Sequence, residues 1–206
     1  MKRPGLYAMK TRRARTTTQR SSATVPPYAS RVMHHAVTIF ETAWGWMGIA
    51  VSEDRPGICR IVLPQPSRLA VEAEIGPWKM AKPAGANEQI LREAQKQLIA
   101  FLEGKRSTLD FPVDLSIGTP FQRLVWQATL RIPYGRVRSY KWVAAKIGGQ
   151  HYARAVGLAL GANPVPIMVP CHRVVAHDGS LGGFSCGLKA KRRLLALEGT
   201  LSQLKS

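Results

Sequence analysis

Cysteine is scarce in this 206-residue chain, and long apolar runs are missing. The only cysteines are Cys59, Cys171 and Cys186, an odd count without the spacing of a zinc site. No apolar run reaches the length of about 18 residues that a membrane span needs, and the first 35 residues lack the apolar core of a secretory signal. We therefore expect a chain from a reducing compartment, without a disulfide framework, resident metal, cofactor or membrane association.

The first 40 residues contain no acidic side chain, and the last 88 contain only two. The formal net charge is +18. Residues 1–40 hold eight Lys and Arg and no acid, and residues 41–118 are close to neutral. Residues 119–206 hold thirteen basic side chains and two acids, Asp178 and Glu198. This asymmetry favours a polyanion, nucleic acid above all, facing the C-terminal half, and the alternative is a solvated basic surface.

The composition divides the chain into three segments. Residues 1–36 are rich in Arg, Ser and Thr and predict a disordered basic arm, with an organellar transit peptide as the alternative. Residues 37–115 predict a small α/β domain. We expect its strands at 37–41, 44–51, 58–63 and 111–115, and a helix at 87–103 that Asn87 caps and Gly104 ends.

Residues 116–206 carry a different pattern. Thr119 and Pro120 predict an N-cap and a first helical position, and the helix at 121–130 would turn Leu124, Val125 and Ala128 inward. Ser139 caps a second helix at 140–147, and a third covers 152–162. Helices joined by a glycine turn in a basic segment predict a helix-turn-helix. Small residues make the third helix narrow enough to approach DNA closely, or to pack tightly against another helix.

Cys171 stands between the apolar run 165–169 and two basic residues, His172 and Arg173. Cationic neighbours lower the pKa of a thiol, so Cys171 is a candidate thiolate with His172 as its base. If this segment is a strand, adjacent side chains point to opposite faces, and His172 needs a water to reach the sulfur. The alternative is an inert buried cysteine.

Six motifs in a fixed order decide between these alternatives. They are residues 132–140 (IPYGRVRSY), 153–157 (ARAVG), 161–167 (GANPVPI), 170–175 (PCHRVV), 182–185 (GGFS) and 197–199 (LEG). Together they resemble the O6-alkylguanine-DNA alkyltransferases, also called methylated-DNA–protein-cysteine methyltransferases. The resemblance implies an α+β chain with a ribonuclease-H-like domain at 37–115 and a winged helix-turn-helix domain at 116–206. It also implies direct, irreversible DNA repair in a single turnover.

The resemblance assigns roles to individual residues. Cys171 would accept the alkyl group, with His172 as its base through a water and Glu198 orienting that histidine. Asn163 would brace the loop that carries Cys171. Tyr140 would press on a phosphate and donate to guanine N3. The expected DNA contacts are Arg154, as a finger in the base stack, with Tyr140, Arg136, Ala153 and Arg173. The expected pocket residues are Val174, Ser185, Leu160 and Phe184, with Ser185 donating near O6.

Three positions depart from the family pattern. Cys186 replaces a glycine and puts a second thiol near the pocket, where it would narrow the space for large alkyl groups or pair with Cys171 on oxidation. Phe184 replaces a tyrosine of some relatives, and Tyr152 is bulkier than the small residue expected there. A zinc site built from His34, His35 and Cys59 is a poor alternative to the expectation of no metal.

The implied partner is double-stranded DNA containing O6-alkylguanine or O4-alkylthymine, bound by a monomer. The location would be the bacterial cytoplasm, or the nucleus or an organelle in a eukaryote. A lesion-binding alkyltransferase-like protein is the main rival function, but those relatives lack the reactive cysteine. A winged-helix transcription factor leaves the Pro-Cys-His-Arg run unexplained, and a cysteine hydrolase would not need the basic domain.

Overall fold

The computed structural model describes residues 35–52, 55–76, 80–81 and 85–205. The chain separates into Met1–Arg31 and a compact unit, Val32–Ser206, to which the described residues belong. The arm predicted at 1–36 therefore lies almost wholly outside the described residues. Within those residues, no helix is both long and apolar enough to cross a membrane.

A four-stranded sheet forms the N-terminal part. It contains β1 (His35–Thr42), β2 (Gly45–Ser52), β3 (Ile58–Gln65) and the short β4 (Met80–Ala81), in the order β3-β2-β1-β4. The first three strands are antiparallel, and β4 runs parallel to β1. The three strands predicted at 37–41, 44–51 and 58–63 are confirmed to within two residues at each end.

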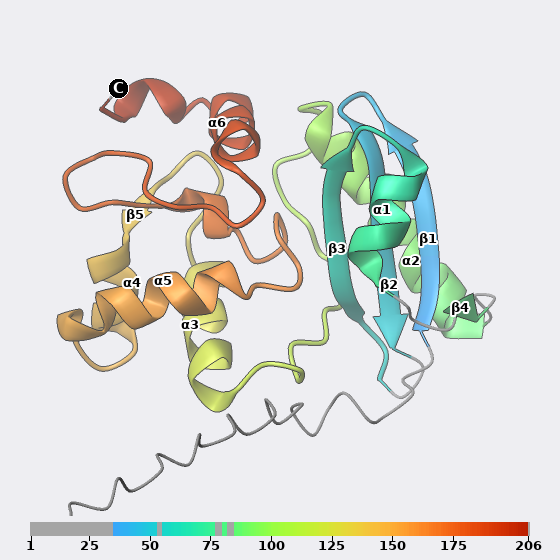
Figure 1. The fold of residues 1–206 in the computed structure, drawn as a ribbon, viewed down its shortest axis with the longest axis horizontal. Helices are drawn as coiled ribbons and strands as arrows, with labels where there is room; N and C mark the ends of the chain where they lie inside the picture. Colours follow the sequence, from blue (N-terminus) through green and yellow to red (C-terminus); the bar gives the residue numbers. More distant parts are fainter. Residues whose placement is uncertain (1–34, 53–54, 77–79, 82–84, 206) are drawn as a thin grey trace, which may run out of the picture. The chain divides into compact units, whose positions relative to one another are not determined.

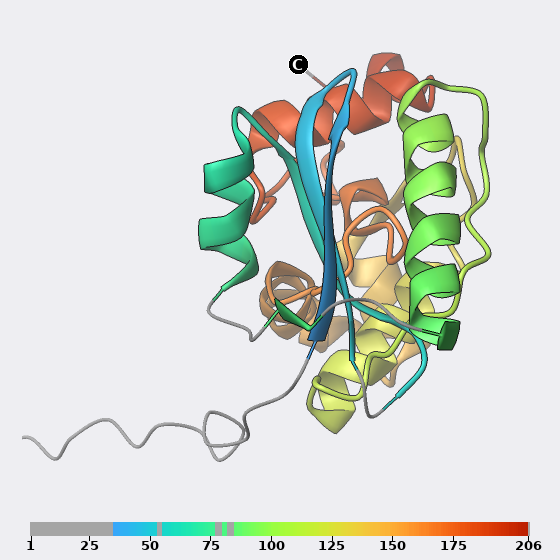
Figure 2. The ribbon, with the colours of Figure 1, turned by 90° about the vertical axis from the view of Figure 1, so that its right-hand side faces the viewer.

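The sheet has an apolar layer on each face, as the period-two alternation of strand side chains requires. Helix α1 (Arg68–Ile75) covers one face, where Val71 and Ile75 join Val37, Ala50 and Val62. Helix α2 (Gly85–Leu102) covers the other and packs on β1 and β2, as Figure 2 shows. The buried positions of α2 are Leu91, Ala94, Gln97, Leu98, Phe101 and Leu102.

Two expectations for this region are wrong, and one helix was missed. Helix α2 begins two residues before Asn87, so Asn87 is inside the helix and is not its cap. Residues 111–115 form only a single bridge between Val113 and Ile58, not a strand. Helix α1 was not predicted, although Ser67 caps it by accepting from the Ala70 N–H.

The C-terminal part is mainly helical, with α3 (Pro120–Leu130), α4 (Tyr140–Lys146), α5 (Ala153–Gly161) and α6 (Leu188–Leu197) (Figure 1). Short 3₁₀ helices cover Gln150–Tyr152, Cys171–Arg173 and Leu201–Gln203, and the two-residue strands β5 (Arg138–Ser139) and β6 (Val174–Val175) pair in parallel. The caps at Thr119 and Ser139 are confirmed, the first as a full capping box. Leu124 is 51% exposed, so the prediction that it turns inward is wrong.

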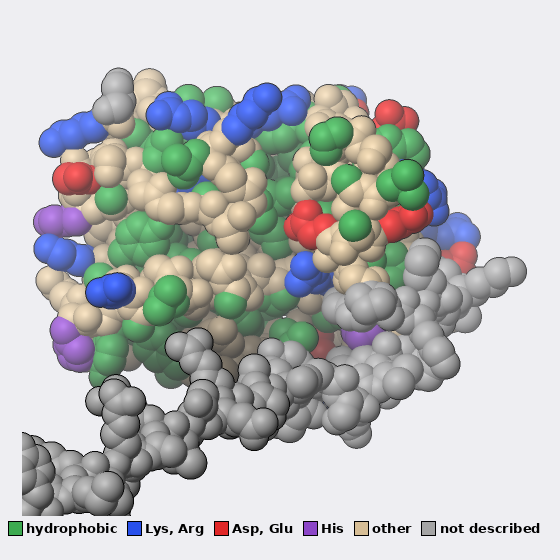
Figure 3. Space-filling model, in the orientation of Figure 1, with side chains coloured by type: hydrophobic (Ala, Val, Ile, Leu, Met, Phe, Trp, Pro, Cys, Tyr) green, Lys and Arg blue, Asp and Glu red, His purple; other side chains and the backbone are tan. Residues whose placement is uncertain are grey.

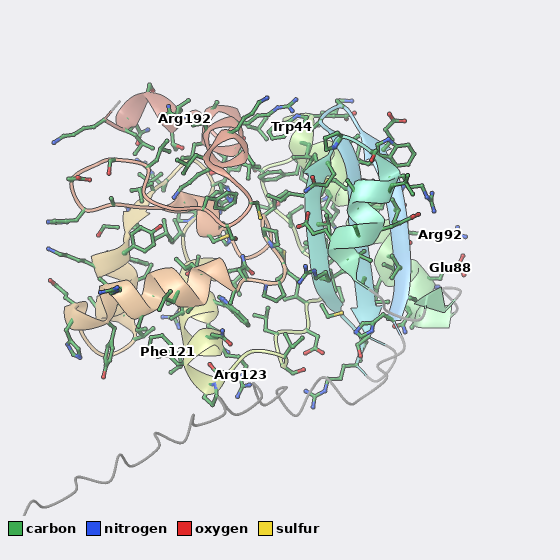
Figure 4. The ribbon with its side chains drawn as sticks, in the orientation of Figure 1. Trp44, Glu88, Arg92, Phe121, Arg123 and Arg192 are labelled. Carbon is green, nitrogen blue, oxygen red and sulfur yellow. The ribbon has the colours of Figure 1, made fainter. Side chains whose placement is uncertain are left out.

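Specific contacts fix α5 and the loop after it against the rest of the unit. The indole N–H of Trp126 on α3 donates to the carbonyl of Ala159 on α5 at 2.9 Å. The Ile61 N–H of β3 donates to the Pro164 carbonyl at 2.8 Å. Trp44, labelled in Figure 4, lies in the β1–β2 turn. The guanidinium of Arg193 on α6 lies over its ring, 3.8 Å from the ring centre. Because Val32–Ser206 is one compact unit, the domain boundary predicted at 115/116 stays a prediction.

Candidate active site

Cys171 follows a tight loop that leaves the end of α5. The loop contains Ile167 at φ 72°, the only non-glycine residue with positive φ in the part of the chain that the structure describes. This conformation is unfavourable for a β-branched side chain, so the surrounding contacts must hold it. The loop ends in the 3₁₀ helix Cys171–Arg173, where Cys171 is 4% exposed. Cys171 and His172 thus lie in a 3₁₀ helix, and the argument that a strand would turn their side chains to opposite faces does not apply.

Asn163 holds this loop and also touches the sulfur. Its Nδ2 donates to the Val169 carbonyl at 2.9 Å and to Cys171 Sγ at 3.1 Å. Its Oδ1 accepts from the Val165 N–H at 3.1 Å. One amide thus bridges both ends of the loop and points a donor at the thiol, which favours the thiolate.

The resting state of Cys171 differs from the sequence expectation. Burial raises the pKa of the Cys171 thiol to about 11, although the Asn163 hydrogen bond and the charge of Lys191 lower it. His172 contributes no cation, because burial lowers its own pKa against the pull of Glu198. The neutral thiol is therefore the dominant form in the free protein near pH 7, and the predicted low pKa is wrong for that state.

Next to Cys171, His172 forms a buried pair with Glu198, the C-cap residue directly after α6. His172 Nε2 lies 2.8 Å from Glu198 Oε1, and both side chains are fully buried. A carboxylate only accepts, so Nε2 carries the proton of the neutral ring and Nδ1 keeps its lone pair. Within the described structure, Nδ1 is buried and has no hydrogen-bond partner. This leaves Nδ1 as a base without a competing proton donor.

Arg173 completes the cluster around Glu198. Its Nε and Nη2 each lie 2.9 Å from a Glu198 oxygen, and its Nη1 donates to the Ile132 carbonyl at 2.7 Å. Burial opposes ionisation of Glu198, but the hydrogen bonds from His172 and Arg173 and the positive charge of Arg173 hold its pKa below the ordinary value. Arg173 was expected to contact DNA. In the structure its guanidinium is buried and already paired with Glu198, and the contact with DNA stays a prediction.

Lys191, on α6, is a site residue that the sequence analysis missed. It is fully buried, and its Nζ donates to the carbonyls of Val174 and Leu181 at 2.6 Å and of Gly183 at 3.1 Å. Burial lowers its pKa to about 8, and the nearby Cys171 opposes that fall. In the sequence, Lys191 lies one helical turn before Leu194 and Leu195, on the apolar face of α6. This position could have indicated that Lys191 is buried.

Tyr140 lies at the start of α4, across from the loop 182–184. Its hydroxyl donates to the Gly183 carbonyl at 3.2 Å. Burial raises the pKa of this hydroxyl, and the proximity of Cys171 adds to the rise. A Cβ on Gly182 would approach the Tyr140 ring to 2.9 Å, so a glycine is required for this contact. The structure thus brings Tyr140, Lys191 and Cys171 together.

The other predicted pocket residues surround this group in different ways. Val174 and Leu160 are buried, Phe184 is half-buried with its ring centre 6.0 Å from Lys191 Nζ, and Ser185 is exposed beside Cys186. Burial raises the pKa of the Cys186 thiol. Cys186 and Cys171 are both free thiols in the structure.

Helix α5 has an exposed face, on which Arg154 and Leu158 lie one helical turn apart. Arg154 is exposed, and so is Leu158, which is 74% exposed and was not singled out from the sequence. Arg136 is exposed before β5, and Ala153 is half-buried at the start of α5. On the face drawn in Figure 3, basic side chains predominate over the helical part and acidic ones gather over the sheet. The predicted DNA contacts other than Arg173 are therefore accessible or partly so.

Metal ligation has little support in the described part of the chain, where no three His, Cys, Asp or Glu side chains come together. Cys59 is buried, and burial raises its pKa to about 12. His34 lies outside the described residues, so the alternative zinc site with His35 and Cys59 is not tested. The chemistry that the site supports is that of a buried thiol with an adjacent base.

Comparison with known proteins shows which family this chain resembles. The 6-O-methylguanine DNA methyltransferase DNA-binding domain matches residues 120–200. The methylated-DNA–protein-cysteine methyltransferase of Methanosarcina barkeri is 46% identical over 112 residues, which are 54% of this chain and 70% of that protein. The Mycolicibacterium paratuberculosis protein of the same name is 48% identical over 112 residues, 54% of this chain and 67% of that protein.

The similarity to a solved structure covers the N-terminal sheet as well as the helical part. The Mycobacterium tuberculosis OGT in complex with DNA has a TM-score of 0.65 and 35% identity, covering 81% of this chain and 94% of that one. Fold and site together define a DNA-repair transferase that uses a cysteine. The chain belongs to the methylated-DNA–protein-cysteine methyltransferase family, as the motifs predicted, and the α+β class is confirmed.

Proposed function

We propose that this protein repairs DNA by moving the alkyl group of O6-alkylguanine, or of O4-alkylthymine, irreversibly onto Cys171. Family membership supports DNA repair by alkyl transfer. The observation that carries the assignment to Cys171 is the environment of its sulfur. Sγ lies 3.1 Å from an amide donor on Asn163, and the next residue is one half of a buried His–Glu pair.

The thiol must lose its proton before it attacks. His172 Nδ1 takes this proton through a bridging water, as the family resemblance implies, and the buried Glu198 carboxylate stabilises the imidazolium that forms. The Asn163 donor and the Lys191 charge stabilise the thiolate. Because burial disfavours both ions, the free protein keeps a neutral Cys–His pair, and deprotonation is tied to the arrival of substrate.

Transfer is a displacement at the alkyl carbon. The sulfur forms a C–S bond while the C–O6 bond breaks, and the leaving guanine takes up the proton. Tyr140 at N3 and Ser185 near O6 donate hydrogen bonds to the developing negative charge, as oxyanion donors do in other enzymes. The backbone around Val174 and the side chains of Leu160 and Phe184 enclose the base. The product thioether is stable, so each molecule acts once.

A base inside the duplex is out of reach of Cys171, so it must be flipped out. The pair α4 and α5 supplies the helix-turn-helix, within a winged helix-turn-helix domain at 116–206, and the sheet supplies the ribonuclease-H-like domain at 37–115. Arg154 enters the stack from α5, while Arg136, Tyr140 and Ala153 contact the phosphates. Flipping costs a few kcal/mol, which these contacts offset. The protein acts as a monomer without a cofactor.

The test is transfer of a labelled methyl group from a duplex containing O6-methylguanine. Cys171→Ala should bind the duplex with unchanged affinity and take up no label, because only the acceptor is lost. Cys59→Ala is the matched control, because Cys59 is also a buried cysteine but lies in the layer under α1. It should still take up one methyl group. Label on Cys171→Ala would refute the assignment.

A further inference from the structure

Helix α5 exposes one large apolar side chain, that of Leu158. It is 74% exposed and follows the exposed Arg154 by one helical turn. The inner face of the helix is filled by other residues, since Val156, Ala159 and Leu160 are buried. Leu158 therefore contributes little to the core, and its burial against a partner would be favourable.

A second observation on the same face indicates a partner that comes close to the helix. Gly161 is exposed and lies three residues after Leu158, in the last turn of α5. A Cβ at Gly161 would meet no atom of the described structure within 4 Å, and its φ is not positive. Neither packing nor backbone conformation therefore requires glycine, although glycine is less favourable in a helix than alanine. Its small size leaves room for a ligand at the helix backbone.

The charge around this face indicates a polyanion. Residues 119–206 hold thirteen basic side chains and two acidic ones, and one of the two, Glu198, is buried and paired with Arg173. Helix α5 itself contains Arg154 and no acidic residue. The minor groove of DNA is only about 6 Å wide, so it favours a face with small side chains. Proteins that bind this groove combine arginine with apolar side chains.

The floor of the minor groove differs between base pairs in one group. A G·C pair carries the N2 amino group of guanine there, whereas an A·T pair presents only acceptors. Leucine offers this amino group no acceptor and displaces the water that would satisfy it, so one donor is left unpaired. The helix rises about 6 Å between Arg154 and Leu158. This rise corresponds to about two base pairs along the duplex.

We propose that Leu158 packs on the minor-groove floor about two base pairs from the guanine that Arg154 replaces, and that it selects against a guanine amino group at that pair. This inference rests on the proposed entry of Arg154 into the base stack. Because Leu158 lies on one side of Arg154, the selection applies to one side of the lesion. The bases next to the damage then influence the rate of repair through a residue that touches neither the damaged guanine nor Cys171.

The experiment measures second-order rate constants for methyl transfer from duplexes that hold one O6-methylguanine. The second and third pairs on either side of the lesion are changed one at a time. Replacing G·C by inosine·C removes the amino group, and replacing A·T by 2,6-diaminopurine·T adds it. The measured quantity is the rate without the amino group divided by the rate with it, which cancels differences in folding and in chemistry at the thiol.

Three proteins are compared first. They are the wild type, Leu158→Ala and the matched control Leu69→Ala, because Leu69 is a 75% exposed leucine on α1 in the sheet part. We expect a ratio of about ten in the wild type, at one position on one side of the lesion, as one unpaired donor predicts. Leu158→Ala should bring this ratio close to one, whereas Leu69→Ala should retain it. Leu158→Asn supplies an acceptor for the amino group and should bring the ratio to one or below.

A wild-type ratio near one at every position, or a ratio that Leu158→Ala leaves unchanged, would overturn the assignment. Equal ratios on both sides of the lesion would also overturn it, because they would indicate a response to DNA shape. A dimer of the free protein that Leu158→Ala abolishes, measured by sedimentation, would assign Leu158 to a contact between two copies instead. Failure of the wild type to take up methyl from any of these duplexes would refute the proposed function itself.

Discussion

Glu198 Oε1 lies 2.8 Å from His172 Nε2 and 2.9 Å from Arg173 Nη2, so one carboxylate oxygen joins the histidine of the site to a buried arginine. The hydrogen bonds from His172 and Arg173 keep Glu198 ionised, and the ionised Glu198 in turn accepts the Nε2 proton of His172. Nδ1 remains the free base beside Cys171. Glu198, 26 positions after His172 in the sequence, thus determines which nitrogen of His172 is the base.

Glu198→Gln tests this relay. Gln retains the size and one acceptor but cannot stabilise an imidazolium, so alkyl transfer should slow by about tenfold or more. Arg173 loses its counter-charge in a buried site, so the free energy of unfolding should also fall, on the order of 3 kcal/mol. Transfer rates and a chemical denaturation curve measure the two effects. An unchanged rate would exclude Glu198 from the relay.

The Glu198 pKa also fixes a pH dependence of stability. Its pKa is lower in the folded protein than in the unfolded chain, so its contribution to stability is present above the unfolded pKa. It is lost as the pH falls through the folded pKa. Wild type should therefore lose more stability than Glu198→Gln as the solution is acidified below about pH 4.3. Parallel loss in both proteins would show that Glu198 is not ionised by its partners.

Lys191→Met tests the charge behind the thiol. Methionine fills a similar volume but removes a cation that, with a pKa of about 8, is charged at pH 7 and neutral where the thiol itself titrates, near 11. At pH 7 the variant should therefore hold less thiolate, and its rates of reaction with iodoacetamide and of methyl transfer should both fall about tenfold. At pH 10, where Lys191 is neutral in the wild type, the two proteins should react with iodoacetamide at similar rates. An unchanged rate at pH 7 would contradict the role of Lys191.

The local signals in the sequence predicted much of the fold. Capping by Thr119 and Ser139 depends on side chains within three residues, and both caps are present. Leu124 was misplaced because the buried stripe of α3 runs through Val125, Trp126, Ala128 and Thr129, and Leu124 lies outside that stripe on the helix circumference. Helix α1 is only eight residues long, and its flanking prolines hid it.

The site residues could be found from motifs, but not their electrostatics. Arg173 is next but one to Cys171 in sequence, yet its charge is taken up by Glu198. The cation that does act on Cys171 is Lys191, twenty residues later and on another helix. The pKa of a buried thiol depends on such spatial neighbours and on desolvation, and neither follows from sequence adjacency.

The variant Arg154→Ala distinguishes a role of Arg154 in base flipping from a role in alkyl transfer. Arg154 is the only Lys or Arg of α5, and its neighbours are mostly small, so it can fill the space that guanine leaves. Repair of duplex O6-methylguanine should slow by one to two orders of magnitude, matching about 1–3 kcal/mol of uncompensated unstacking. Reaction with free O6-benzylguanine needs no flipping and should change little. An equal loss on both substrates would show that Arg154 supports the pocket instead.

The central claim is that one cysteine accepts one alkyl group and keeps it. Intact-mass and peptide-mapping mass spectrometry, after incubation with excess duplex containing O6-methylguanine, measures this directly. The account predicts a mass increase of a single methyl group, located on the peptide with Cys171, and no increase with undamaged duplex. An unmodified protein, or a methyl group found on Cys59 or Cys186 instead, would contradict it.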